Sequence, residues 1–128
     1  MPWINQACLD PKHTHFIYLI KNLDTNELYI GKKQLTQRRY SHTTKRYIYS
    51  PSNWQNYQSS SQIVSKWNPD RIEKTILQGC FSAREATYLE TSLLFKADAL
   101  SEDTPFVNKN IGGKYFTHTA YKGTPLHY

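Results

Sequence analysis

The chain has 128 residues, 38% of them hydrophobic, which suits one domain with a core that needs no disulfide or metal support. Sixteen Lys and Arg residues against ten Asp and Glu give a net charge of +6, which favours a polyanionic partner. No segment approaches the roughly 18 apolar residues of a membrane span, and the first residues do not resemble a signal peptide. These features predict a cytoplasmic protein that does not contact a membrane.

The positive charge is concentrated in one part of the chain. Residues 28–69 contain seven Lys and Arg but no Asp or Glu, and Tyr and Trp residues are interleaved among them. Cations pair with phosphates and aromatic rings stack on bases, so this composition predicts nucleic-acid contact. The alternative is a solvated basic face whose aromatic residues close a small core. The side chains expected to bind DNA are Lys33, Lys45, Arg46, Trp54, Tyr57 and Lys66.

The first elements predicted in chain order are an irregular arm and a β-hairpin. Residues 1–14 form the arm, and the apolar runs 15–20 and 28–31 form two strands joined by a polar turn. A turn centred between residues 23 and 24 places Tyr18 directly opposite Tyr29, on the same side of the sheet.

The later segments predict two further helices, a third strand and one clear amphipathic helix. We expect a short helix at 34–40, a loop at 50–53, a helix at 62–67 and a strand at 71–77. A capping box at Ser82 and Glu85 begins a helix predicted over 83–100. Residues 111–128 form a C-terminal tail, and 1–128 is expected to be a single domain.

Glu90 falls within the apolar face of that last helix. Burying a carboxylate there is costly unless a cation, a metal ion or hydrogen bonds compensate, so a salt bridge to arginine and a metal site are both open. Arg38 and Arg39 follow the hairpin and suit either a phosphate or an exposed surface. His42 lies four residues after Arg38 and could share its face in a helix.

Two tripeptides separated by a fixed distance resemble a known signature. Phe16-Ile17-Tyr18 and Tyr29-Ile30-Gly31, with eleven residues from the first tyrosine to the second, are similar to the paired motif of the GIY-YIG nuclease family. Phe16 stands where the family has a glycine. The supporting positions follow in the family's order: Arg39 or its neighbour Arg38, Glu90 on a helix, and Asn108 or Asn110.

This resemblance implies an α+β domain in which helices flank a three-stranded, mainly antiparallel sheet. It also implies a DNA endonuclease that hydrolyses phosphodiester bonds with one Mg²⁺ or Mn²⁺ held by Glu90, and it leaves open whether cleavage is sequence-specific. Tyr18 would orient or deprotonate water with help from Lys32 or Lys33, and Tyr29 would hydrogen-bond near the phosphate. An arginine would stabilise the transition state, and Asn108 would hold the rim of the site.

Several alternatives remain open from the sequence. The chain looks most similar to small standalone members of the family encoded by phages and to a branch of restriction enzymes. Cleavage of both strands of double-stranded DNA would suit a homodimer. A binding module that holds DNA or RNA without cutting it is the alternative function.

Overall fold

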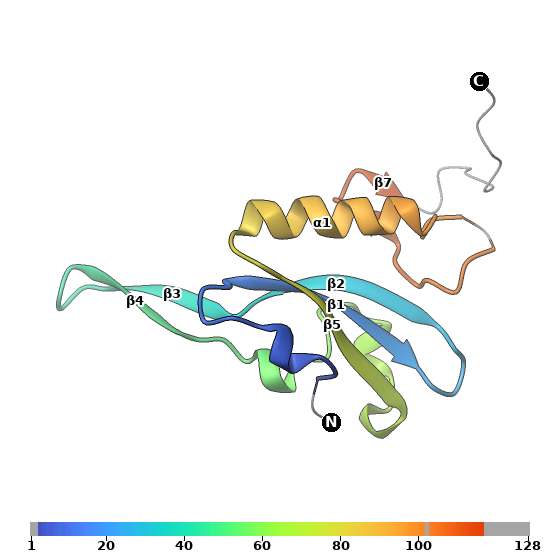
Figure 1. Ribbon diagram of the computed structural model, residues 1–128, viewed down its shortest axis with the longest axis horizontal. Helices are drawn as coiled ribbons and strands as arrows, with labels where there is room; N and C mark the ends of the chain where they lie inside the picture. Colours follow the sequence, from blue (N-terminus) through green and yellow to red (C-terminus); the bar gives the residue numbers. More distant parts are fainter. Residues whose placement is uncertain (1–2, 102, 117–128) are drawn as a thin grey trace.

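The computed structural model describes residues 3–101 and 103–116, and its centre is a three-stranded antiparallel sheet (Figure 1). Strands β1 (His15–Asn22), β2 (Leu28–Gln34) and β5 (Ile72–Cys80) lie in the order β2-β1-β5, so β2 is an edge strand. Helix α1 (Ala83–Lys96) lies along one face of this sheet. The predicted α+β class with a small antiparallel sheet is confirmed.

Side chains alternate between the two faces of the sheet, and each face has its own core. Phe16, Tyr18 and Ile20 point to the face covered by the N-terminal arm and by residues 54–67; we call it the tyrosine face. Ile17 and Ile30 point to the opposite side, where they pack with Ala86 and Leu94 of α1 and with the residues that follow the helix; we call it the helix face.

The β1–β2 hairpin has a different register from the predicted one. Tyr18 pairs with Gly31, and Tyr29 pairs with Ile20, so the strands are shifted by two residues. The turn is longer than expected because Asn22 closes it: its N–H donates to the carbonyl of Glu27 at 2.9 Å, and its Oδ1 accepts from the N–H of Asp24 at 2.9 Å. An even shift keeps side chains on the same face, so both tyrosines still point to the tyrosine face.

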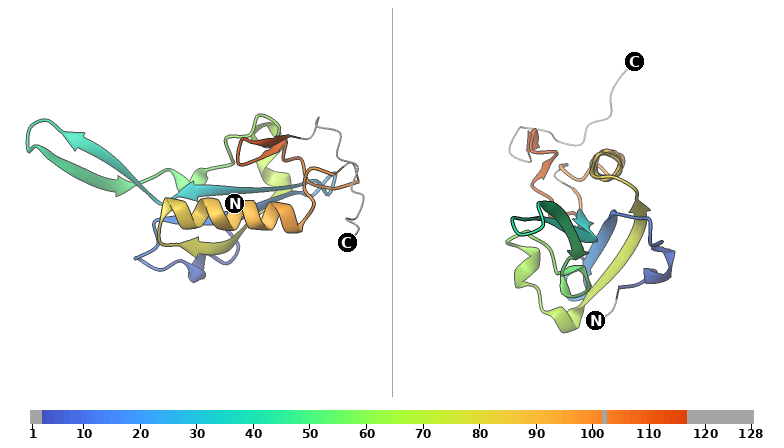
Figure 2. Two further views of the ribbon diagram at one scale, coloured as in Figure 1. Left: turned by 90° about the horizontal axis from the view of Figure 1, so that it is seen from above. Right: turned by 90° about the vertical axis from the view of Figure 1, so that its left-hand side faces the viewer.

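The helix predicted at 34–40 is wrong, and the loop predicted at 50–53 is correct only for residues 52–53. Strands β3 (Thr36–Ser41) and β4 (Arg46–Pro51) form a two-stranded antiparallel hairpin that projects from the body of the molecule (Figures 1 and 2). We call residues 36–51 the ribbon. Buried Leu35 anchors its base, because its N–H donates to Thr14 at 2.7 Å and its carbonyl accepts from Ser52 at 2.8 Å.

The other connections are short. Single 3-10 turns occur at η1 (Gln6–Cys8), η2 (Trp54–Asn56), η3 (Val64–Lys66) and η4 (Pro69–Arg71), and a small hairpin is formed by β6 (Asn110–Ile111) and β7 (Tyr115–Phe116). The helix predicted at 62–67 is therefore only one turn. The described part of the arm packs on the sheet through buried Trp3.

Helix α1 begins where the capping box predicts. The Ser82 side chain accepts from the N–H of Glu85 at 3.0 Å. The helix ends at Lys96, earlier than predicted, and Asp98 has a left-handed backbone with φ of 49°. Of the predicted tail, residues 117–128 lie outside the described residues. Across 3–101 and 103–116, no helix is long and apolar enough to cross a membrane.

Candidate active site

Tyr18 is fully buried at the centre of the tyrosine face. Its partner across the hairpin is Gly31, and a Cβ atom at position 31 would collide with the hydroxyl and ring of Tyr18. The phenol therefore lies over the backbone of β2 in space that any other residue at position 31 would fill. This packing explains physically why the second tripeptide ends in glycine.

Three phenols gather around this point, and we call Tyr18, Tyr29 and Tyr57 the tyrosine cluster. The ring centre of Tyr18 lies 6.2 Å from that of Tyr29 and 6.1 Å from that of Tyr57. The Tyr18 hydroxyl donates to Ser59 Oγ at 3.1 Å. Ser59 has a positive φ of 104°, which is unusual for a residue with a side chain and is maintained by the surrounding loop.

Burial governs the protonation of these phenols. It raises the pKa of Tyr18 well above the usual value for tyrosine, and the hydrogen bond with Ser59 offsets only part of the rise. Burial also raises the pKa of Tyr29; the Ser59 hydroxyl counters this in part, whereas the negative charge of Glu90 adds to it. Both side chains are thus neutral phenols at neutral pH, suited to donating hydrogen bonds.

The two lysines after Gly31 lie on opposite sides of β2. Lys33 shares the tyrosine face, and its Nζ lies 4.3 Å from the centre of the Tyr57 ring. Lys32 points to the helix face and donates from Nζ to Thr87 Oγ1 of α1 at 2.5 Å. Lys33 therefore contacts the tyrosine cluster, whereas Lys32 contacts α1.

Glu90 is half-buried on α1, next to the edge strand β2. Burial raises the pKa of its carboxyl group, and the positive charge of Lys32 opposes that rise. The negative charge of Glu90 also contributes to the raised pKa of Tyr29. In the described part of the chain the only ion pair is Arg71–Asp24, so Glu90 does not form the arginine salt bridge that the sequence left open.

A single carboxylate in this setting is compatible with a hard divalent cation. Among the described residues, no group of three His, Cys, Asp or Glu side chains could enclose a metal ion. Mg²⁺ keeps several waters and commonly binds one or two carboxylates together with substrate phosphates. Glu90 is partly desolvated and lacks an arginine partner. Both properties are compatible with a carboxylate that binds a metal ion together with water and a substrate phosphate.

Asn108 holds the edge of β2 immediately after Tyr29. It is buried, and its amide makes two hydrogen bonds to the backbone of Ile30: Oδ1 accepts from the N–H at 3.2 Å, and Nδ2 donates to the carbonyl at 2.8 Å. Asn110 is exposed and accepts from the N–H of Gly113 at 3.0 Å. Of the two asparagines, Asn108 is the one that hydrogen-bonds to the strand that carries Tyr29.

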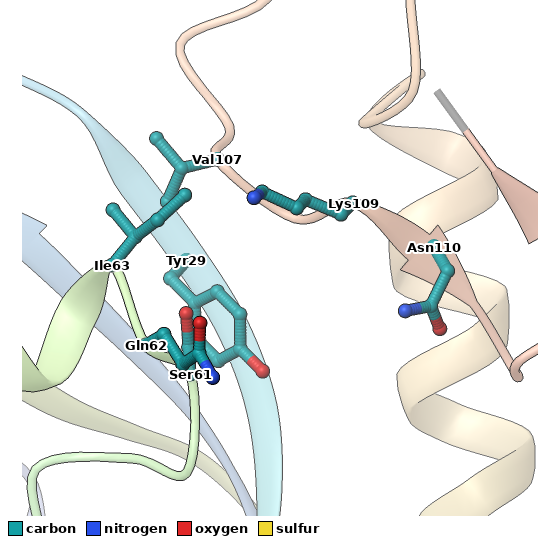
Figure 3. A pocket seen from close by; sticks show the side chains of 7 residues that line it. All are labelled: Tyr29, Ser61, Gln62, Ile63, Val107, Lys109 and Asn110. Atoms are coloured by element: carbon teal, nitrogen blue, oxygen red, sulfur yellow. The ribbon is translucent and has the colours of Figure 1, made fainter. Parts of the chain in front are cut away.

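A cavity of about 230 Å³ opens beside Tyr29 (Figure 3). Ser61, Gln62 and Ile63 line it from the segment before η3, and Val107, Lys109 and Asn110 line it from the chain near β6. Its polar and cationic groups could contact a nucleotide next to the reacting phosphate. Of the residues around this cavity, the sequence singled out only Tyr29 and Asn110. It missed Ser59 and Ser61, because a run of serines is also typical of a helix cap.

The other predicted site residues are distributed over two regions. Arg38, Arg39, His42, Lys45 and Arg46 belong to the ribbon, and none has a described contact with the tyrosine cluster or Glu90. The guanidinium of Arg38 lies over the ring of Tyr47, 4.3 Å from its centre. Trp54 packs in the core, whereas Lys66 is exposed on η3.

Two tyrosines on adjacent strands, beside a carboxylate on the next helix, define a nuclease domain of the GIY-YIG class. The family model described as "Putative endonuclease segE, GIY-YIG domain" matches residues 3–111, and the chain belongs to this GIY-YIG nuclease family. Neither the curated proteins nor the solved structures contain a match to the chain. The family match covers the tyrosine cluster, α1 and Asn108, and it establishes nuclease function in general terms.

Proposed function

We propose that the protein is an endonuclease that hydrolyses phosphodiester bonds in double-stranded DNA with one Mg²⁺ or Mn²⁺ ion. The observation that carries the proposal is that Tyr29 lies on the edge strand β2 and Glu90 lies on α1, the helix that packs against that strand. The phenols and the carboxylate come from opposite faces of the sheet, and the edge strand is the place where both can contact one phosphate.

The tyrosine cluster positions the phosphate and the attacking water. Because the phenols of Tyr18 and Tyr29 are neutral, Tyr29 can donate a hydrogen bond toward the phosphate, whereas Tyr18 donates its proton to Ser59 Oγ and keeps its oxygen as an acceptor for the water. Lys33 adds positive charge on the same face. Donors that are held in place before the reaction stabilise the charge that develops on a phosphate as the bond breaks.

Glu90 is the proposed metal ligand, and Arg38 or Arg39 is the proposed source of a guanidinium for the phosphate. The divalent ion, when bound, neutralises charge on the leaving oxygen. Both arginines follow β2 closely, on the first strand of the ribbon, so DNA that spans the edge of β2 and the ribbon would contact them. Asn108 keeps the backbone of β2 in place beside Tyr29.

Plasmid cleavage tests the proposal. Supercoiled plasmid is incubated with wild type, Glu90→Gln and Glu85→Gln, each with Mg²⁺, with Mn²⁺ and with EDTA. Glu85 is a matched control because it is a glutamate on the same helix, five residues earlier. We expect metal-dependent cutting by wild type and Glu85→Gln, and at least a hundredfold loss, roughly the effect of one transition-state contact, for Glu90→Gln. Cutting that survives EDTA or Glu90→Gln would contradict the metal role.

The second candidate is a module that binds nucleic acid without cutting it. The position of Arg38 and Arg39 on the ribbon, away from the tyrosine cluster, favours this candidate. It predicts salt-sensitive DNA binding that requires neither Glu90 nor a divalent ion. Binding by a well-folded wild type that cuts no plasmid, branched or single-stranded substrate would establish it instead of the nuclease.

A further inference from the structure

The ribbon has the dimensions and charge of an element that enters DNA. It carries four Lys and Arg residues and no Asp or Glu. Each strand has six residues, about 20 Å at 3.4 Å per residue, and the two strands lie about 5 Å apart. The major groove of B-DNA is about 12 Å wide and admits a two-stranded ribbon. In the left view of Figure 2, the ribbon extends clear of the sheet and α1.

The two faces of the ribbon differ in chemistry. One face is packed on itself: the ring of Tyr40 lies 5.3 Å from that of Tyr47 and 5.1 Å from that of His42, and Arg38 stacks on Tyr47. The pairing of β3 with β4 places the remaining side chains on the opposite face. We call this the polar face, and it consists of Gln37, Arg39, Ser41, Arg46, Ile48 and Ser50.

Most polar-face groups have no partner in the described part of the chain. The side chains of Gln37, Arg39 and Arg46 are exposed and make no hydrogen bond, ion pair or ring contact within residues 3–101 and 103–116. These residue types match base edges in the major groove: arginine pairs with guanine, glutamine pairs with adenine, and an apolar side chain such as Ile48 contacts the methyl group of thymine.

We propose that the ribbon inserts its polar face into the major groove of duplex DNA and reads base pairs beside the cutting site. This inference rests on the proposed function for the location of the cut, but the reading of bases does not require cleavage. We assign duplex DNA as the partner because the ribbon is positively charged and has no acidic residue. A hairpin in the major groove lies between two negatively charged phosphate backbones, which this charge complements. Arg46 pairs with Ser41, the last pair before the connecting turn, so it is the polar-face cation nearest the tip of the ribbon.

Selection from a duplex library tests the proposal without cutting. The full chain carrying Glu90→Gln is incubated with duplexes that contain a randomised segment, and bound DNA is sequenced. Binding to the enriched duplex and to a scrambled duplex is then measured by fluorescence anisotropy. The same measurements are made with Arg46→Ala added, with Tyr49→Ser, which changes the opposite face, and with Lys96→Ala, which removes a cation from the far end of α1.

We expect an enriched motif, and a loss of about 10- to 100-fold in affinity for it with Arg46→Ala, but a much smaller loss on the scrambled duplex. The Tyr49→Ser and Lys96→Ala variants should still bind the enriched motif in preference to the scrambled duplex. The absence of a motif, or an equal loss on both duplexes, would overturn base reading and leave only phosphate contact. Failure of the proposed endonuclease function would give a different result: wild type would bind the motif but would not cut DNA that contains it.

Discussion

The phenol of Tyr18 occupies the space in which a side chain at position 31 would stand. Gly31→Ala should therefore push Tyr18 out of place and lower the free energy of unfolding by about 1–3 kcal/mol, the usual cost of overpacking a core. Urea denaturation measures the change. Cleavage should fall as well, because Tyr18 would no longer be held toward Ser59.

A double-mutant cycle separates this clash from a general effect on β2. In a Tyr18→Leu background the ring is gone, so Gly31→Ala should cost clearly less than it does in wild type. An equal cost in both backgrounds would mean that Gly31 is needed for the strand itself rather than for Tyr18.

Asn108 supports β2 through two buried hydrogen bonds to Ile30. Asn108→Ala would leave the N–H and carbonyl of Ile30 unpaired, so we expect a loss of about 2–3 kcal/mol of unfolding free energy. Asn110→Ala is the matched control: this residue is exposed, and its loss should cost about 0.5 kcal/mol. Thermal or urea unfolding distinguishes them, and equal effects would contradict the assignment of Asn108 to the edge of the sheet.

The elements with a strong local signal were predictable. The spacing of Ala86, Leu89 and Leu93 after the Ser82 cap predicts α1, because one apolar face repeats along it. The hairpin signal placed both tyrosines on one face of the sheet. Its register differed because the side chain of Asn22 sets the turn length, and no hydrophobic pattern records that bond.

The ribbon could not be identified from hydrophobic alternation. Both of its faces are exposed, so its side chains alternate between aromatic and polar types rather than between apolar and polar ones. Glu90 was recognised because a carboxylate within an apolar face is costly. Ser59 gave no such signal, since its role depends on a positive φ and on a partner 41 residues earlier in the chain.

Ser59 is predicted to orient Tyr18 at the expense of backbone strain. Glycine adopts positive φ readily, so Ser59→Gly should be more stable than Ser59→Ala by about 1 kcal/mol. Both variants remove the acceptor of the Tyr18 hydroxyl and should cut DNA more slowly than wild type. Ser60→Ala, which changes an exposed neighbour, is the control for stability and cleavage. Unchanged cleavage in both Ser59 variants would show that the hydroxyl does not position Tyr18.

His15 makes stability depend on pH in a defined direction. Burial lowers the pKa of its imidazole, and the positive charge of Lys32 lowers it further. The folded protein thus favours neutral imidazole, whereas the unfolded chain takes up a proton near pH 6.5. The stability that the neutral His15 side chain provides is fully present above pH 6.5, and it is lost as the pH falls through 6.5 toward the pKa of His15 in the folded protein.

Urea denaturation at pH 7.5 and 5.5 tests this dependence. On acidification, the free energy of unfolding should fall less for His15→Gln than for wild type. Lys32→Gln should give an intermediate loss, because it removes only the charge contribution; an identical loss in all three proteins would exclude His15 as the source.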